Sequence, residues 1–132
     1  MRKMRLILMV CLSAIVLPLL AQTEWKLIWT EEFDADGAYN PEVWEPERGF
    51  VRNHEDQWYQ AENAFLQDGL LIIEGRKEQR PNPTYRPEGH YWGQQRPNIE
   101  YTSACLHTRG KREFLYERLE VCARIPTAGG SW

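Results

Sequence analysis

The sequence is poor in cysteine and histidine, with three of each, and it lacks the metal and nucleophile motifs of several enzyme classes. His54, His90 and His107 lie at irregular spacings without cysteine clusters, which argues against a zinc site. The serines lack the Gly-x-Ser-x-Gly context of a hydrolase nucleophile. After residue 21 only Cys105 and Cys122 remain, too few for a disulfide scaffold. A disulfide between them is allowed in an exported protein, but we favour two buried thiols.

Long hydrophobic runs are missing after residue 21, and the one such run lies at the start of the sequence. Three basic residues precede the run Leu6–Leu20 and the small residue Ala21 follows it, which is typical of a secretory signal peptide. A membrane anchor is the alternative, but the run is short for a span and Pro18 interrupts it. Cys11 lies within the run rather than after small residues at its end, so lipidation is not expected. We therefore expect cleavage after Ala21 and a secreted or periplasmic protein with no membrane span.

The sequence also lacks an excess of positive charge. Its formal net charge is −3, and removal of residues 1–21, which contain three basic and no acidic residues, makes it −6. This acidity argues against nucleic acid or an anionic membrane as a partner, because either would require a basic surface. The remaining 111 residues are enough for one small domain at most.

Helix signals are nearly absent. The one candidate is a single capped turn over residues 40–44, with Asn40 as the N-cap and Pro41 at the first helical position. Residues 79–98 hold four prolines, two glycines and three aromatic residues. We expect them to form a long loop whose aromatic side chains fold onto the protein.

Four runs have the alternation or the apolar continuity of β-strands. They are residues 25–30, 69–78, 101–108 and 114–125. The second run follows the turn signal Asp68-Gly69 and has four consecutive apolar residues, which predicts a strand buried on both faces. The last two runs flank a turn at residues 109–111 and predict an antiparallel hairpin with one core face and one polar face. An all-β chain of this kind should close into a sandwich or a barrel, but half a sandwich would leave an apolar face uncovered.

Aromatic residues are dense, with six tryptophans and six tyrosines. Sugar rings pack on aromatic rings while their hydroxyls need fixed donors and acceptors, so this composition favours a polysaccharide site. Core packing is the alternative for any one of these aromatic residues. In residues 52–59, Asn53, Glu55 and Gln57 recur at period two and share one face of an extended strand, for which a solvated edge strand is an equal alternative. The residues alone therefore indicate an exported β protein with a sugar-binding face.

Five segments resemble the N-terminal part of glycoside hydrolase family 16. They are LIWTEEFD (27–34), NPEVW (40–44), RNHEDQWYQAENAFLQDGLLIIEGRKE (52–78), YTSACLHTRGKREFLYERLEVCARIP (101–126) and GGSW (129–132). The segments are similar to the laminarinase-like bacterial β-glucanases of the family and occur in the family's order. The resemblance runs from about Trp25 to Trp132, which is nearly the whole chain after residue 21.

This resemblance implies an all-β jelly-roll sandwich of the concanavalin A type, incomplete in this chain, with a polysaccharide cleft across its concave face. In the family, the segment like GGSW leads into a strand with a Glu-x-Asp-x-x-Glu motif, which carries the nucleophile and the acid/base. That motif is absent from the sequence. A retaining double displacement needs two carboxyl groups about 5–5.5 Å apart. The resemblance thus implies that residues 22–132 are the N-terminal portion of a catalytic domain, truncated before the catalytic strand and inactive alone.

The implied function of the full-length protein is endo-acting hydrolysis of β-1,3-glucan, or of mixed β-1,3/1,4-glucan, by a monomer that requires no cofactor. A non-catalytic carbohydrate-binding β-sandwich module is the alternative. The resemblance places no catalytic residue in this chain. The substrate-binding residues that it implies are Asn53, Glu55, His107 and Trp132. A structural calcium, as in many relatives, would be held partly through backbone oxygens near Glu32 and Gly69.

Two positions depart from the family pattern. Glu117 stands where relatives usually have the glycine of Tyr-Gly-Arg, and Cys122 stands where an arginine is common. Glu117 places a charge on the otherwise apolar face of residues 114–125, which costs stability unless the charge is paired. The departures put the local packing of this run in question.

Overall fold

The computed structural model describes residues 25–127. The chain divides into two units, one ending at Glu31 and one beginning at Glu32, and all strands of the described residues lie in the second. The expected signal peptide and Trp132 lie outside the described residues. Within residues 25–127, no helix is long and apolar enough to span a membrane.

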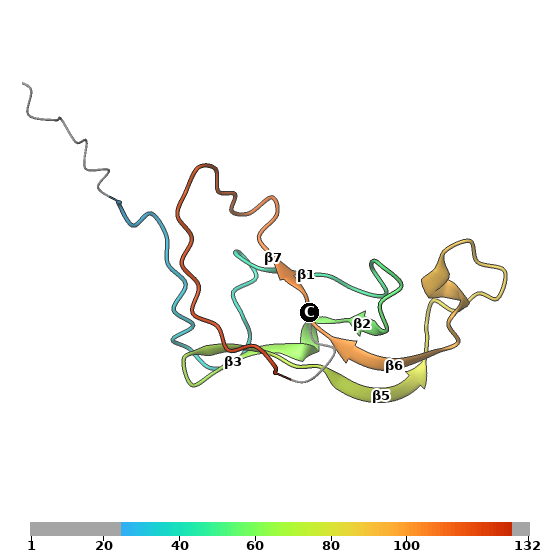
Figure 1. Cartoon of the computed structure of the whole chain (residues 1–132). Helices are drawn as coiled ribbons and strands as arrows, with labels where there is room; N and C mark the ends of the chain where they lie inside the picture. Colours follow the sequence, from blue (N-terminus) through green and yellow to red (C-terminus); the bar gives the residue numbers. More distant parts are fainter. Residues whose placement is uncertain (1–24, 128–132) are drawn as a thin grey trace, which may run out of the picture. The chain divides into compact units, whose positions relative to one another are not determined.

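The second unit is an all-β fold of short strands in three small sheets (Figure 1). Two single-turn 3₁₀ helices, η1 (Ala61–Asn63) and η2 (Trp92–Gln95), interrupt the strands. The first sheet pairs β1 (Glu45–Pro46) with β7 (Leu106–His107), antiparallel. The second has the order β2 (Gln57–Tyr59), β6 (Asn98–Ser103), β5 (Arg76–Pro81), with β2 parallel to β6. The third is the hairpin of β3 (Ala64–Gln67) and β4 (Leu70–Ile73).

The β3–β4 hairpin confirms the predicted turn at Asp68-Gly69. Both residues have positive φ, 53° and 73°, as the two central positions of a type I′ turn require. The predicted burial of the following strand on both faces is wrong, because Leu70 is 60% exposed and Ile73 is 50% exposed. The physical reason is that β4 has only β3 as a neighbour, and that the run 69–78 breaks before β5 instead of forming one strand.

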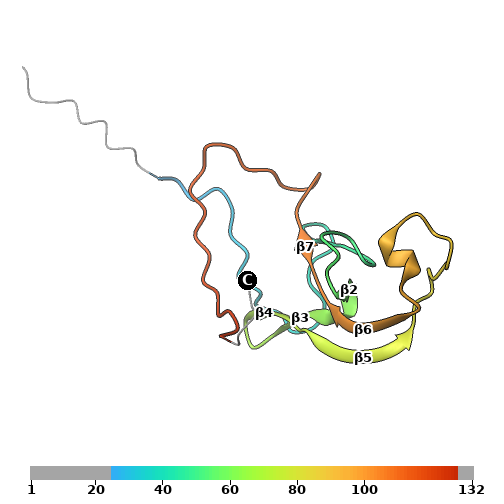
Figure 2. The same ribbon diagram turned by 45° about the vertical axis from the view of Figure 1, so that its right-hand side comes forward.

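The core lies along the central sheet, where β6 runs between β2 and β5 (Figure 2). Ile99 and Thr102 of β6 are both buried although they are three positions apart. The register between β5 and β6 shifts between Lys77 and Arg80, where β5 has one residue more than β6. Thr102 faces Trp58 of β2 and therefore lies within the hydrogen-bonded centre of the sheet.

Asn63, at the end of η1, is a buried polar residue with no exposed surface. Its side-chain amide donates to the Glu74 carbonyl at 3.0 Å and to the Thr102 hydroxyl at 3.1 Å. Its side-chain oxygen accepts from the amide of Gln60 at 2.7 Å, and Arg80 donates in turn to Gln60. This network fastens η1 to the beginning of β5 and to the middle of β6.

Two of the expected strands are not formed. Residues 25–30 and residues 114–125 contain no strand, so the prediction of a C-terminal hairpin with residues 101–108 is wrong (Figures 1 and 2). In the second run, Leu115, Val121 and Ile125 are 74%, 83% and 76% exposed. Alternation marks side chains that can be buried, but a strand also needs a hydrogen-bonded neighbour and a layer that covers its apolar face. The described residues provide no paired strand for either run.

The predicted turns at residues 40–44 and 109–111 are formed, because a turn depends on hydrogen bonds between residues close in the sequence. The Asn40 side chain accepts from the backbone N–H of Glu42 at 2.9 Å, and the Asn40 carbonyl accepts from Val43 and Trp44. Residues 109–111 form the expected turn after β7, closed by hydrogen bonds from the backbone N–H groups of Lys111 and residue 112 to the Thr108 carbonyl. The capped turn at residues 40–44 and the turn at residues 109–111 are thus confirmed.

Candidate functional site

The segment 52–59 is half turn and half strand. Asn53 and His54 both have φ of 55°, in the left-handed region, and β2 begins only at Gln57. The predicted extended strand over the whole segment is therefore wrong for its first half. Left-handed backbone is tolerated by asparagine but is unusual for histidine, so packing must hold this turn in place.

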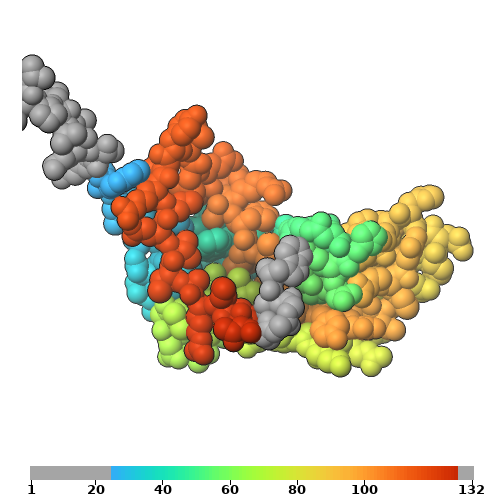
Figure 3. All heavy atoms as spheres, viewed as in Figure 1, coloured from blue at the N-terminus to red at the C-terminus, as the bar shows by residue number. Residues whose placement is uncertain are grey.

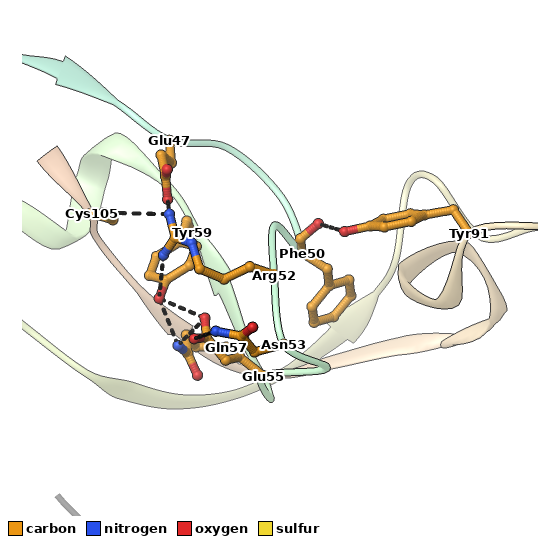
Figure 4. Close-up of polar contacts among 9 residues, drawn as sticks. All are labelled: Glu47, Phe50, Arg52, Asn53, Glu55, Gln57, Tyr59, Tyr91 and Cys105. Carbon is orange, nitrogen blue, oxygen red and sulfur yellow. Dashed lines mark hydrogen bonds and ion pairs between the residues drawn. The ribbon is translucent and has the colours of Figure 1, made fainter. Parts of the chain in front are cut away.

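The turn nevertheless brings the three predicted polar side chains together around one carboxylate (Figure 4). The Glu55 Oε2 atom accepts from the Tyr59 hydroxyl at 2.9 Å and from the Gln57 amide at 3.1 Å. Its Oε1 atom accepts only a longer bond, 3.4 Å, from the Asn53 amide. The Gln57 amide also donates to the Tyr59 hydroxyl at 2.8 Å. These four residues are called the Glu55 cluster below.

Arg52 lies next to the Glu55 cluster and contacts it through Tyr59. It forms an ion pair with Glu47, its Nη1 lies 3.5 Å from the Tyr59 hydroxyl, and its Cζ is 5.4 Å from the centre of the Tyr59 ring. The hydrogen bond to Glu47 raises the pKa of Arg52, so the guanidinium stays charged. Burial, more than the hydrogen bonds from Gln57 and to Glu55, controls the pKa of Tyr59 and raises it. The Tyr59 hydroxyl therefore remains a donor to Glu55 at neutral pH.

Cys105 Sγ lies 3.9 Å from Arg52 Nη2 (Figure 4). Cys105 and Cys122 are both free thiols; Cys105 is half-buried and Cys122 is exposed. The expectation of two buried thiols is therefore wrong for Cys122, which lies in the uncovered run 114–125.

Iodoacetamide should label Cys122 before Cys105. Burial raises the pKa of the Cys105 thiol, and a hydrogen bond with Glu47 raises it further, so less reactive thiolate forms at a given pH. We expect roughly tenfold faster labelling of Cys122 at pH 8, followed by mass spectrometry of the two peptides. Labelling in denaturant is the control and should remove the difference, whereas equal rates in the native protein would contradict the burial of Cys105.

A hollow of about 510 Å³ opens over the Glu55 cluster. Its lining consists of Asn53, His54, Glu55, Asp56, Gln57 and Tyr59. The lining is rich in carboxylate and amide oxygens, and Glu55 Oε1 has only one long hydrogen bond within the protein. An open set of acceptors with a few amide donors suits a ligand that carries many hydroxyl groups.

Aromatic rings support the hollow from one side. Phe50 packs edge-on against Trp58 and tilted against Trp92, with ring centres 5.4 Å apart in both pairs. The His54 ring lies 4.9 Å from Trp92, and Tyr91 lies 5.5 Å from Trp92. The expectation that aromatic residues of the 79–98 loop fold onto the protein is thus confirmed for Tyr91 and Trp92. Figure 3 shows the loop, in yellow and gold, beside the green segment that precedes β2.

The remaining predicted site residues lie elsewhere. His107 is in β7 opposite Glu45. Its buried Nδ1 atom has no hydrogen-bond partner within the described chain, so this atom makes no hydrogen bond to the Glu55 cluster. Gly69 is in the β3–β4 turn, and Glu32 is an exposed residue at the start of the second unit. Side chains of residues 25–127 form no group of three or more metal-binding residues. A calcium held through backbone oxygens near Glu32 and Gly69 stays a prediction.

Comparisons with known proteins agree with this fold. No protein-family model matches the chain. A β-glucanase of Rhodothermus marinus is 40% identical over 113 residues, which are 82% of this chain and 34% of that protein. The catalytic domain of an endo-1,3-β-glucanase (laminarinase) from Thermotoga petrophila is similar in structure, with 36% identity and a TM-score of 0.55 over 70% of this chain and 35% of that one. A non-specific endo-β-1,3(4)-glucanase from family GH16 matches with 28% identity and a TM-score of 0.50, over 70% and 34%.

The all-β fold of the described residues, together with these structural neighbours, is that of a jelly-roll protein. More narrowly, the chain is similar to the laminarinase-like enzymes of glycoside hydrolase family 16. The chain spans about a third of the length of the Rhodothermus marinus β-glucanase and of the Thermotoga petrophila catalytic domain.

Proposed function

We propose that the chain forms the N-terminal part of a secreted or periplasmic endo-β-glucanase that acts on β-1,3-glucan or on mixed β-1,3/1,4-glucan. The observation that carries the proposal is the hollow over the Glu55 cluster, where a carboxylate held by three donors faces an open space. The similarity to β-glucanases supports this substrate class. The acidic surface fits a neutral, hydroxyl-rich polymer better than an anionic one.

In this proposal the described residues bind the glucan and do not break its bonds. Glu55 accepts hydrogen bonds from sugar hydroxyls, and Asn53 and Gln57 supply amide donors and acceptors beside it. Cleavage with retention requires two carboxyl groups about 5–5.5 Å apart, as nucleophile and as acid/base. The Glu-x-Asp-x-x-Glu motif that would supply them is absent from residues 1–132, so the chain by itself should be inactive.

Release of reducing ends from laminarin tests the proposal. We expect the protein expressed from its complete gene to produce oligosaccharides of several lengths, as an endo-acting enzyme does, and residues 22–132 alone to produce none. Agarose and carrageenan serve as control polymers. Binding of laminarin without hydrolysis by the complete protein would favour the non-catalytic carbohydrate-binding module instead. The absence of both binding and hydrolysis would overturn the proposal.

A further inference from the structure

Arg96, just after η2, holds the backbone of the turn that carries the Glu55 cluster. Its Nη1 donates to the Glu55 carbonyl at 3.2 Å, and its Nη2 pairs with Asp56 Oδ1 at 2.8 Å. Its guanidinium also lies over the Phe50 ring, with Cζ 4.9 Å from the ring centre. One planar side chain thus contacts three residues of the segment 50–56, which a lysine could not do.

The loop of residues 82–97 is built to hold Arg96 in this position. The buried Asn82 side chain donates to the Gly93 carbonyl at 2.8 Å and to the Arg96 carbonyl at 2.7 Å. Gly93 lies so close to Phe50 that a Cβ atom at this position would come within 2.8 Å of the Phe50 Cβ. The Tyr91 hydroxyl donates to the Phe50 carbonyl. These hydrogen bonds and the close approach of Gly93 to Phe50 therefore hold the loop against residues 50–56.

We propose that Arg96 is a positioning residue of the glucan site, which rests on the proposed function. The consecutive left-handed residues Asn53 and His54 are intrinsically unfavourable, and no hydrogen bond from Arg96 reaches a side chain of the Glu55 cluster. Arg96 instead fixes the next two residues of the backbone, Glu55 and Asp56. The backbone of the turn then directs Asn53 and Glu55 into the hollow before sugar arrives, so little ordering is required on binding.

Titration of laminaritriose at 4 °C into the protein expressed from its complete gene tests this role. We expect R96A to raise Kd about tenfold, because the turn must be ordered on binding, and R96K to fall between R96A and the unaltered protein. The matched control is R86A, an exposed arginine of the same loop, which should bind normally. A merely structural role would lower the unfolding temperature of R96A and leave the Kd of the folded protein unchanged.

A double-mutant cycle between Arg96 and Asn53 distinguishes a positioning role of Arg96 from a merely structural one. If Arg96 acts through the turn, the R96A increase in Kd should be smaller when Asn53 is already alanine, because one of the two positioned side chains is gone. An unchanged Kd in folded R96A, or equal effects of R96A with and without Asn53, would overturn the inference alone. If R96A does not fold, R96K with normal affinity would overturn it. Failure of the unaltered protein to bind laminaritriose would overturn the proposed function as well.

Discussion

The N63L variant is expected to lose about 3 kcal/mol of unfolding free energy, which would unfold many domains of this size. Leucine is close to asparagine in size and fills the site, but it can neither donate to the Glu74 carbonyl and the Thr102 hydroxyl nor accept from Gln60. The buried Thr102 hydroxyl then lacks this partner, which costs about 1–3 kcal/mol, and the two part-buried groups of Glu74 and Gln60 add less. The loss also leaves η1 held to the sheet region through backbone hydrogen bonds, from the Glu74 N–H to the Asn63 carbonyl and from the Gln60 N–H to the Ser103 carbonyl.

Denaturant unfolding of the protein expressed from its complete gene measures the effect, with N98L as the matched control. Asn98 begins β6 and is exposed, so the same substitution there should change stability by less than about 0.5 kcal/mol. A midpoint for N63L that equals the N98L midpoint would show that the Asn63 hydrogen bonds contribute nothing net. Loss of the folded state altogether in N63L would agree with the prediction, and N63S, which keeps one hydroxyl, should then restore part of the stability.

Local turn chemistry could be predicted from the sequence, and strand pairing could not. The turns at Asn40 and at Asp68-Gly69 form because a side-chain cap or a left-handed backbone acts within a few residues. The strands expected at 25–30 and 114–125 do not form because alternation describes one strand and contains no information about its neighbour. The all-β class is confirmed. It depends on the absence of helix signals and on the family resemblance, and neither requires every strand to be predicted correctly.

The sequence predicted part of the candidate site, but it predicted an extended strand where the structure has a turn. Period-two spacing identified Asn53, Glu55 and Gln57, and they do gather, but through a left-handed turn instead of one strand face. Arg96 was missed as a site residue because its decisive contacts join distant positions, and Arg52 was missed because it falls outside the period-two pattern of Asn53, Glu55 and Gln57. Arg96 lies 41 residues from the carbonyl that it holds. No local pattern marks an arginine whose partner is on another element.

The E55Q variant should bind β-1,3-glucan oligosaccharides about thirtyfold more weakly, corresponding to about 2 kcal/mol, provided that the proposed function is right. Glutamine keeps the size of the side chain but removes the charge. Hydrogen bonds to a charged group contribute about 1.5–3 kcal/mol, roughly twice the value of neutral ones. The amide would also place an N–H group where Glu55 Oε1 or Oε2 now accepts, so either the sugar or the Tyr59 hydroxyl faces a donor instead of an acceptor.

Titration of laminaritriose at 4 °C, with E88Q as the control, measures this effect. Glu88 is exposed in the 82–97 loop, so E88Q makes the same charge change outside the hollow and should leave Kd unchanged. The Y59F variant separates the two ways in which Glu55 can act. If Glu55 binds sugar through Oε1, Y59F should cost only a few-fold in affinity, because the Gln57 amide still holds Oε2. Equal affinities of E55Q and the unaltered protein would exclude Glu55 from the binding surface and leave its carboxylate a structural partner of Tyr59.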